Sequence, residues 1–172
     1  MSGKTTSLKS LFKYFGKQET LKSIESTTGR TLFFDFGVLN FQGYEWNIKF
    51  LIYSATGQDF YASTRPATLM GVDGIIFIVD SQNTCIKQNL RSWNELFTFF
   101  SNKLYEIPII ICLNKWDLDN KIEKLEFLNK INYTLFEKVD IITTIAIDGI
   151  GIFDSFKNML NFIFPQISIQ IN

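Results

Sequence analysis

The sequence contains no histidine, the side chain that most often serves as a metal ligand and as a general base near neutral pH. Any metal site or proton transfer in this protein must therefore use other residue types. Only two cysteines are present, Cys85 and Cys112, and they lie far apart in the sequence. Cys112 lies within an apolar run and is expected to be a core thiol, so a reducing compartment fits the composition best.

An excess of charge of either sign is also absent, because 17 basic residues balance 17 acidic residues. This balance gives no support for nucleic-acid binding or for a polybasic membrane anchor. No apolar run reaches the roughly 18 residues of a membrane-spanning helix, and we find no signal-peptide pattern. Residue 2 is Ser2, which argues against N-myristoylation. We therefore expect a cytoplasmic protein without an integral membrane segment.

The 172 residues are 46% hydrophobic and 20% charged, as expected for a single globular domain over residues 1–172. Apolar runs typical of strands alternate with amphipathic helical patterns. Strands are predicted over 30–41, 46–53, 72–80, 108–113 and 141–147, and helices over 8–15, 85–100, 122–128 and 152–163. The polar segment 17–30 is predicted to be a loop. This alternation indicates an α/β fold with a mostly parallel sheet flanked by helices.

A polar tetrapeptide, Asn114-Lys115-Trp116-Asp117, directly follows an apolar run that is typical of a buried parallel strand. Ligands of open α/β sheets bind at the carboxyl ends of the strands, where this tetrapeptide is placed. A carboxylate accepts two N–H bonds from one planar edge, and guanine presents a ring N–H beside an amino group. The pattern therefore suits guanine, and a solvated loop is the alternative when the motif is taken alone.

The segment Gly3-Lys4-Thr5-Thr6 lies immediately before the predicted helix over residues 8–15. It matches the second half of the phosphate-binding loop G-x-x-x-x-G-K-[ST]. In that loop, Gly allows close backbone approach, Lys reaches the β- and γ-phosphates, and the hydroxyl holds Mg²⁺. The exposed N–H groups and the dipole of a helix N-terminus also favour an anion. An ordinary helix cap rich in Ser and Thr is the alternative.

In their order and spacing, these segments resemble a Ras-like small GTPase, most closely the bacterial MglA (mutual gliding motility) family. Eukaryotic Arf-like GTPases fit less well. The closer resemblance is carried by the stretches 29–36, 57–61, 71–74 and 146–154. It covers essentially the whole chain and implies a P-loop NTPase fold that binds GTP or GDP together with Mg²⁺.

The resemblance also implies a role for each matching position. The residues that match the phosphate loop are Gly3, Lys4, Thr5 and Thr6, and those that match the guanine-specificity motif are Asn114, Lys115 and Asp117. A backbone N–H from Ala146 is implied to reach the base. The implied Mg²⁺ ligands are Thr5 and Thr31.

The implied catalytic residues are Gln58, which would orient the attacking water, and Arg30, which would act as an arginine finger supplied in cis. A loop amide and a surface arginine are the respective alternatives. Two carboxylates on predicted strands each have two possible roles. Asp35 either supports Mg²⁺ or pairs with a cation, and Asp80 either supports a site residue or caps its strand.

The chain also departs from the Ras-like pattern. Ser54 stands where these enzymes usually carry the Asp of D-x-x-G, although the MglA family has a hydroxyl residue there as well. The first strand and the first half of the phosphate loop are missing ahead of Gly3, and we expect Met1 to be an internal methionine of a longer reading frame. The sheet should therefore have a gap or close over it, and we expect the 172-residue chain to bind nucleotide weakly.

The function implied by the resemblance is a GTP-binding and hydrolysing switch of the MglA type, linked to bacterial cell polarity or gliding motility. Its implied partner is a roadblock-type GTPase-activating protein, and its implied location is the cytoplasm with recruitment to a cell pole. The alternative is a truncated interaction module with impaired nucleotide binding, which takes a strand from a partner by β-augmentation. The guanine motif disfavours an adenine-nucleotide ATPase, whereas hydrolysis by this chain stays open.

Overall fold

The computed structural model describes residues 2–25, 31–43, 46–55 and 69–166. The chain divides into two compact units, which are described separately below. Unit 1 consists of residues 1–3 and 72–168, and unit 2 consists of residues 4–71 and 169–172. The expectation of one domain over residues 1–172 stays a prediction.

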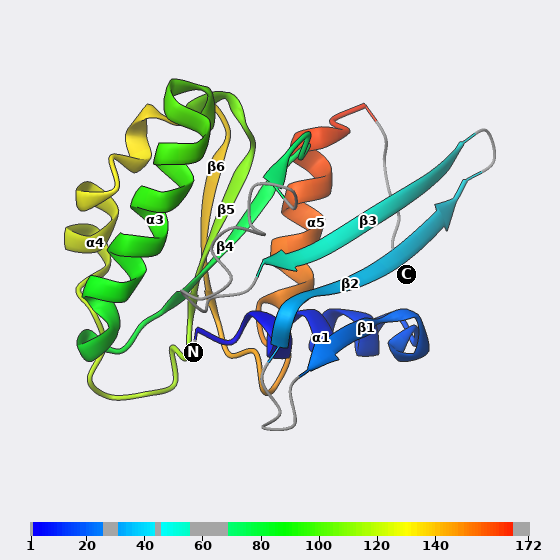
Figure 1. The fold of residues 1–172 in the computed structure, drawn as a ribbon, viewed down its shortest axis with the longest axis horizontal. Coiled ribbons are helices and arrows are strands. Elements are labelled where there is room, and N and C mark those ends of the chain that lie inside the picture. The colour runs from blue at the N-terminus through cyan, green and yellow to red at the C-terminus, as the bar shows by residue number, and fades with distance from the viewer. Residues whose placement is uncertain (1, 26–30, 44–45, 56–68, 167–172) are drawn as a thin grey trace. The chain divides into compact units, whose positions relative to one another are not determined.

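Unit 1 is built on a parallel three-stranded sheet in the order β4-β5-β6 (Figure 1). Its strands are β4 (Ile75–Asp80), β5 (Ile109–Asn114) and β6 (Val139–Thr144). The register places Asp80 opposite Asn114, and Asn114 opposite Thr144. The last residues of all three strands therefore lie side by side at the carboxyl edge of this sheet.

Helices cover both faces of this sheet: α3 (Ile86–Phe100) and α4 (Lys124–Lys130) lie on one face and α5 (Ile152–Ile163) on the other (Figure 1). Short 3₁₀ turns connect the elements at Asn83–Cys85, Ser101–Glu106 and Tyr133–Leu135. Successive side chains of β5 point to opposite faces of the sheet, and helices cover both faces. Strand β5 is therefore buried along its whole length. Ile111 joins the cluster under α3 and α4, whereas Cys112 joins Met159 of α5.

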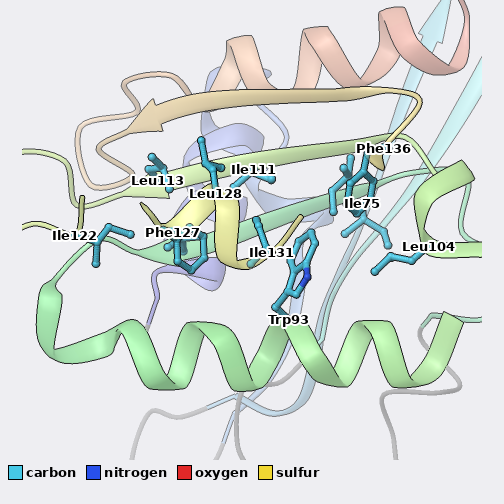
Figure 2. Packing of buried hydrophobic residues seen from close by; sticks show 12 residues of the cluster. Ile75, Trp93, Leu104, Ile111, Leu113, Ile122, Phe127, Leu128, Ile131 and Phe136 are labelled. Carbon is cyan, nitrogen blue, oxygen red and sulfur yellow. The ribbon is translucent and has the colours of Figure 1, made fainter. Parts of the chain in front are cut away.

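The larger hydrophobic cluster of unit 1 fixes the position of α3 against the sheet (Figure 2). Trp93 of α3 is 5% exposed, and its ring lies edge-on to Phe77 and Phe136 at centroid distances of 5.1 and 5.6 Å. Such aromatic pairs add to the free energy gained by burial. The cluster also includes Ile122, close to the loop that follows β5. The carboxyl end of β5 is therefore packed into this cluster.

The same packing explains the chemistry of Cys112 in unit 1. Burial raises the pKa of this thiol from 9.0 to about 12, partly offset by its hydrogen bond to Ser155 Oγ at 3.2 Å. Cys112 is therefore protonated near neutral pH and is a poor nucleophile. This agrees with the prediction of a core thiol.

Unit 2 contains helix α1 (Lys4–Tyr14), a 3₁₀ turn at Gln18–Thr20 and an antiparallel sheet in the order β1-β2-β3. Its strands are β1 (Lys22–Glu25), β2 (Thr31–Gln42) and β3 (Asn47–Ala55). Phe12 of α1 is fully buried, and a Cβ at Gly37 of β2 would collide with its ring. Glycine at this position therefore lets the helix approach the strand closely.

The predicted α/β class, the helix-flanked parallel sheet and the hairpin of β2 and β3 are confirmed. The predicted loop over residues 17–30 is wrong in part, because β1 pairs antiparallel with β2. The sequence Lys-Ser-Ile-Glu has only one apolar residue, so its pattern does not differ from that of a loop. The described strands form two three-stranded sheets. Whether the sheet has a gap or closes over it stays a prediction. In the described part of the chain, every helix is too short or too polar to cross a membrane.

Candidate functional site

The carboxyl edge of the unit 1 sheet is held together by Asn114, the last residue of β5. Its side chain Oδ1 accepts hydrogen bonds from Thr144 Oγ1 at 3.1 Å and from the backbone N–H of Ala146 at 2.9 Å. Its Nδ2 donates to the carbonyl of Ser2 at 2.8 Å. The Asn114 side chain therefore connects three segments that are distant in sequence, and both Oδ1 lone pairs are used.

Gly3 lies against this amide in unit 1. Its φ is +95°, a conformation that favours glycine, and a Cβ at this position would collide with Asn114 Nδ2. The structure thus brings a residue predicted to line the phosphate loop into contact with a residue predicted to contribute to guanine recognition. The chain passes from unit 1 to unit 2 directly after Gly3.

Lys115 begins the loop after β5 with a backbone φ of +62°, in the left-handed region. Its Nζ lies 2.6 Å from Asp80 Oδ2 at the end of the neighbouring strand β4. Asp80 is 3% exposed, and its other oxygen, Oδ1, accepts from the backbone N–H of Gln82 at 3.2 Å. Two roles were left open for Asp80. The ion pair with Lys115 fits the role of supporting a site residue, and the bond from the Gln82 N–H fits the role of capping the strand.

Asp117 is exposed, and its carboxylate has no hydrogen-bond or ion-pair partner among the residues that the structure describes. The loop that carries it is nevertheless fixed. The backbone N–H of Trp116 donates to the carbonyl of Thr144 at 3.2 Å, and that of Leu118 donates to the carbonyl of Lys115 at 3.2 Å. Trp116 also packs against the larger hydrophobic cluster of unit 1. A free carboxylate on a fixed loop is well suited to bind a ligand that presents N–H groups.

Ala146 lies in a tight loop after β6 that is closed by the backbone bridge between Ile145 and Ile150. Its N–H, which the family resemblance directs to the base, donates to Asn114 Oδ1 in this structure. Donation to a base from this position therefore requires the N–H to be shared with Asn114 or released by it. The next residue, Ile147, is 82% exposed.

Unit 2 has its own polar pair. Thr5 Oγ1, in the first turn of α1, donates to Asp35 Oδ2 at 2.7 Å, and Asp35 is fully buried. In the ladder between β2 and β3, Asp35 lies directly opposite Ser54. A hydroxyl residue on the adjacent strand therefore lies opposite this buried carboxylate. Hydroxyl and carboxylate oxygens are the ligands that Mg²⁺ prefers.

The remaining site predictions are not tested by the described residues. Arg30 and Gln58 lie outside them, and only the backbone of Thr31 is described, as the first residue of β2. Lys4 and Thr6 lie in the first turn of α1, which begins four residues before the predicted start at residue 8. Thr144 was not identified from the sequence, because its contact with Asn114 depends on the register of two strands that are 30 positions apart.

The model of the ADP-ribosylation factor family matches residues 1–163. The mutual gliding-motility protein MglA of Myxococcus xanthus (strain DK1622) is 30% identical over 175 residues, which cover 97% of this chain and 87% of that protein. The GTP-binding nuclear protein GSP1 of Encephalitozoon cuniculi (strain GB-M1) is 35% identical over 95 residues, which cover 52% of this chain and 44% of that protein.

A solved structure shows the same fold. It is the Arl6 BBS3 small GTPase from Trypanosoma brucei with the bound nucleotide analogue GppNp, and its TM-score is 0.67. The likeness covers 96% of this chain and 93% of that one at 17% sequence identity, so it supports the fold alone. From the family match and the 30% identity to a nearly full-length relative, we conclude that this chain belongs to the ADP-ribosylation factor family of Ras-like small GTPases.

Proposed function

We propose that this chain is a GTP-binding molecular switch that recognises guanine at the carboxyl edge of the unit 1 sheet. The observation that carries the proposal is Asp117, an exposed carboxylate without a described partner on a loop fixed at both neighbouring residues. Membership of a small-GTPase family supports the same conclusion.

The chemistry of Asp117 selects among purines. Its two oxygens accept the ring N–H and the exocyclic amino group of guanine together, whereas adenine has no ring N–H at that edge. Because the acceptor is charged, these bonds are stronger than neutral ones. Asn114 contributes mainly by fixing the surrounding segments, since only one N–H of its amide lacks a partner among the residues that the structure describes.

The oxygens of Thr5 and Asp35 in unit 2 fit Mg²⁺. This ion retains several waters and is usually bound through one or two protein ligands together with substrate phosphates. When bound, Mg²⁺ neutralises charge on the phosphates. Lys4, with Thr5 and Thr6, lies at the helix N-terminus, where an anion is favoured.

For hydrolysis, we propose that Gln58 orients the attacking water and that Arg30 stabilises the charge of the transferring phosphoryl group. We also propose a role in cell polarity or gliding motility, and the similarity to a mutual gliding-motility protein supports the gliding role. A roadblock-type GTPase-activating protein is the proposed partner, and the proposed location is the cytoplasm with recruitment to a cell pole.

The role of Asp35 is tested by its replacement with asparagine, which keeps the shape and removes the charge. We expect Asp35→Asn to weaken GTP binding in excess Mg²⁺ by about tenfold, or ~1.4 kcal/mol, and to leave binding in EDTA nearly unchanged. A fluorescent GTP analogue titrated under both conditions measures this difference. Glu19→Gln, at an exposed acid of the same unit, is the matched control. Equal Mg²⁺ dependence of Asp35→Asn and wild type would contradict the assignment.

A further inference from the structure

We propose that Asp80 is a positioning residue for guanine recognition, acting through Lys115. The inference rests on the proposed function and assigns a role to a buried carboxylate that does not itself touch the base. Asp80 ends β4, one strand away from Asn114, and its Oδ2 lies 2.6 Å from Lys115 Nζ. The Asp80 side chain is 4% exposed and that of Lys115 is 31% exposed, so the pair is partly shielded from solvent screening.

The backbone of Lys115 needs an external constraint. It is one of three described non-glycine residues with positive φ, the others being Ser101 and Asn132. Asparagine tolerates the left-handed region because its short amide bonds locally, whereas lysine has no such preference. A lysine in this conformation persists when surrounding contacts hold it there. The ion pair with Asp80 is such a contact, because it fixes the far end of the side chain.

Asp80 is in turn held by α3. The buried side chain of Asn89 donates from Nδ2 to the carbonyl of Asp80 at 2.8 Å and accepts the N–H of Asp80 at its Oδ1 at 3.1 Å. Helix α3 is itself fixed by the packing of Trp93 (Figure 2). The carboxylate therefore has a defined position before any ligand binds, as preorganisation requires.

The conformation of Lys115 determines where Asp117 lies. The carbonyl of Lys115 accepts the N–H of Leu118 at 3.2 Å, which closes the turn that carries Asp117. The ion pair also keeps the ammonium of Lys115 away from the Asp117 carboxylate, two residues along the chain. Loss of the Asp80 charge should therefore loosen the turn and let Lys115 compete with the base for Asp117.

The test compares GDP with inosine diphosphate, which lacks only the exocyclic amino group. We take the dissociation constant of inosine diphosphate divided by that of GDP. This ratio reports the contact of Asp117 with the amino group and is insensitive to a uniform loss of affinity. We expect Asp80→Asn to weaken GDP binding about tenfold and to lower this ratio by about threefold or more. The control Glu126→Gln removes the exposed ion pair with Lys130 and should leave the ratio unchanged.

A second variant separates positioning from folding. Lys115→Met keeps an unbranched side chain and removes the charge, and it should lower the ratio to a similar value. In that background Asp80→Asn should have no further effect on the ratio, because Asp80 acts through Lys115. Thermal melts of all variants give the folded fraction, and Lys115→Met alone decides the question if Asp80→Asn does not fold.

The outcomes distinguish the two proposals. A wild-type chain that binds GDP no better than ADP overturns the proposed function and this inference together. A wild type that prefers GDP, combined with an unchanged ratio in Asp80→Asn and in Lys115→Met, overturns this inference alone. A lowered ratio in both variants, with the Glu126→Gln control equal to wild type, supports it.

Discussion

Replacement of Asp117 by asparagine is expected to lower the affinity for GDP about 100-fold and to raise the affinity for xanthosine diphosphate. The Asp117 carboxylate accepts two N–H bonds from guanine, and their loss is worth ~3 kcal/mol. The amide of asparagine presents one acceptor and one donor. Xanthine has a ring N–H beside a carbonyl, so it matches that amide where guanine does not.

Direct titration of both nucleotides against wild type and Asp117→Asn measures this exchange of preference. Asp119→Asn is a matched control, because Asp119 is also exposed and lies two residues further along the same loop. The control should keep the wild-type preference for GDP. If Asp117→Asn kept it too, the carboxylate would have no part in base recognition.

Replacement of Asn114 by alanine is expected to have the largest effect on stability. It leaves Thr144 Oγ1, the N–H of Ala146 and the carbonyl of Ser2 without their bonds to the amide. Thr144 and Ala146 are 0% and 4% exposed, so water cannot readily replace the lost partner. A buried polar group left unpaired costs about 1–3 kcal/mol, and we expect a total of about 3 kcal/mol.

A loss of that size should lower the melting temperature by about 6–12 °C for a chain of this length. Circular dichroism of Asn114→Ala in the absence of nucleotide measures it. The control is Asn83→Ala, which removes the exposed hydrogen bond between Asn83 and Asn120 and should shift the melting temperature little. If Asn114→Ala had the same melting temperature as the control, the three segments would be held together by other contacts.

The sequence was sufficient to predict features that depend on local pattern. The apolar run before Asn114 predicts a buried strand, and the structure confirms β5 as a strand that is buried along its whole length. The helical pattern after Gly3-Lys4-Thr5 correctly predicts α1. The assignment of Asp117 to guanine also follows from local pattern, and it stays a prediction.

Contacts between distant segments could not be predicted in the same way. The bonds from Asn114 to Ser2 and Thr144, and from Lys115 to Asp80, depend on strand order and register. An alternating pattern shows that a segment is a strand but does not show which strand lies beside it. The opposition of Asp35 and Ser54 was missed for the same reason, although both lie in the predicted hairpin.

The most direct test of guanine recognition is a pair of ¹H–¹⁵N spectra of the full chain, one with GDP and one with ADP at the same concentration. This measurement detects weak as well as tight binding. We expect GDP to shift the amide signals of Asp117, Leu118 and Ala146 and ADP to leave them in place. Equal shifts with both nucleotides, or none with GDP, would contradict it and favour an interaction module that does not use nucleotide.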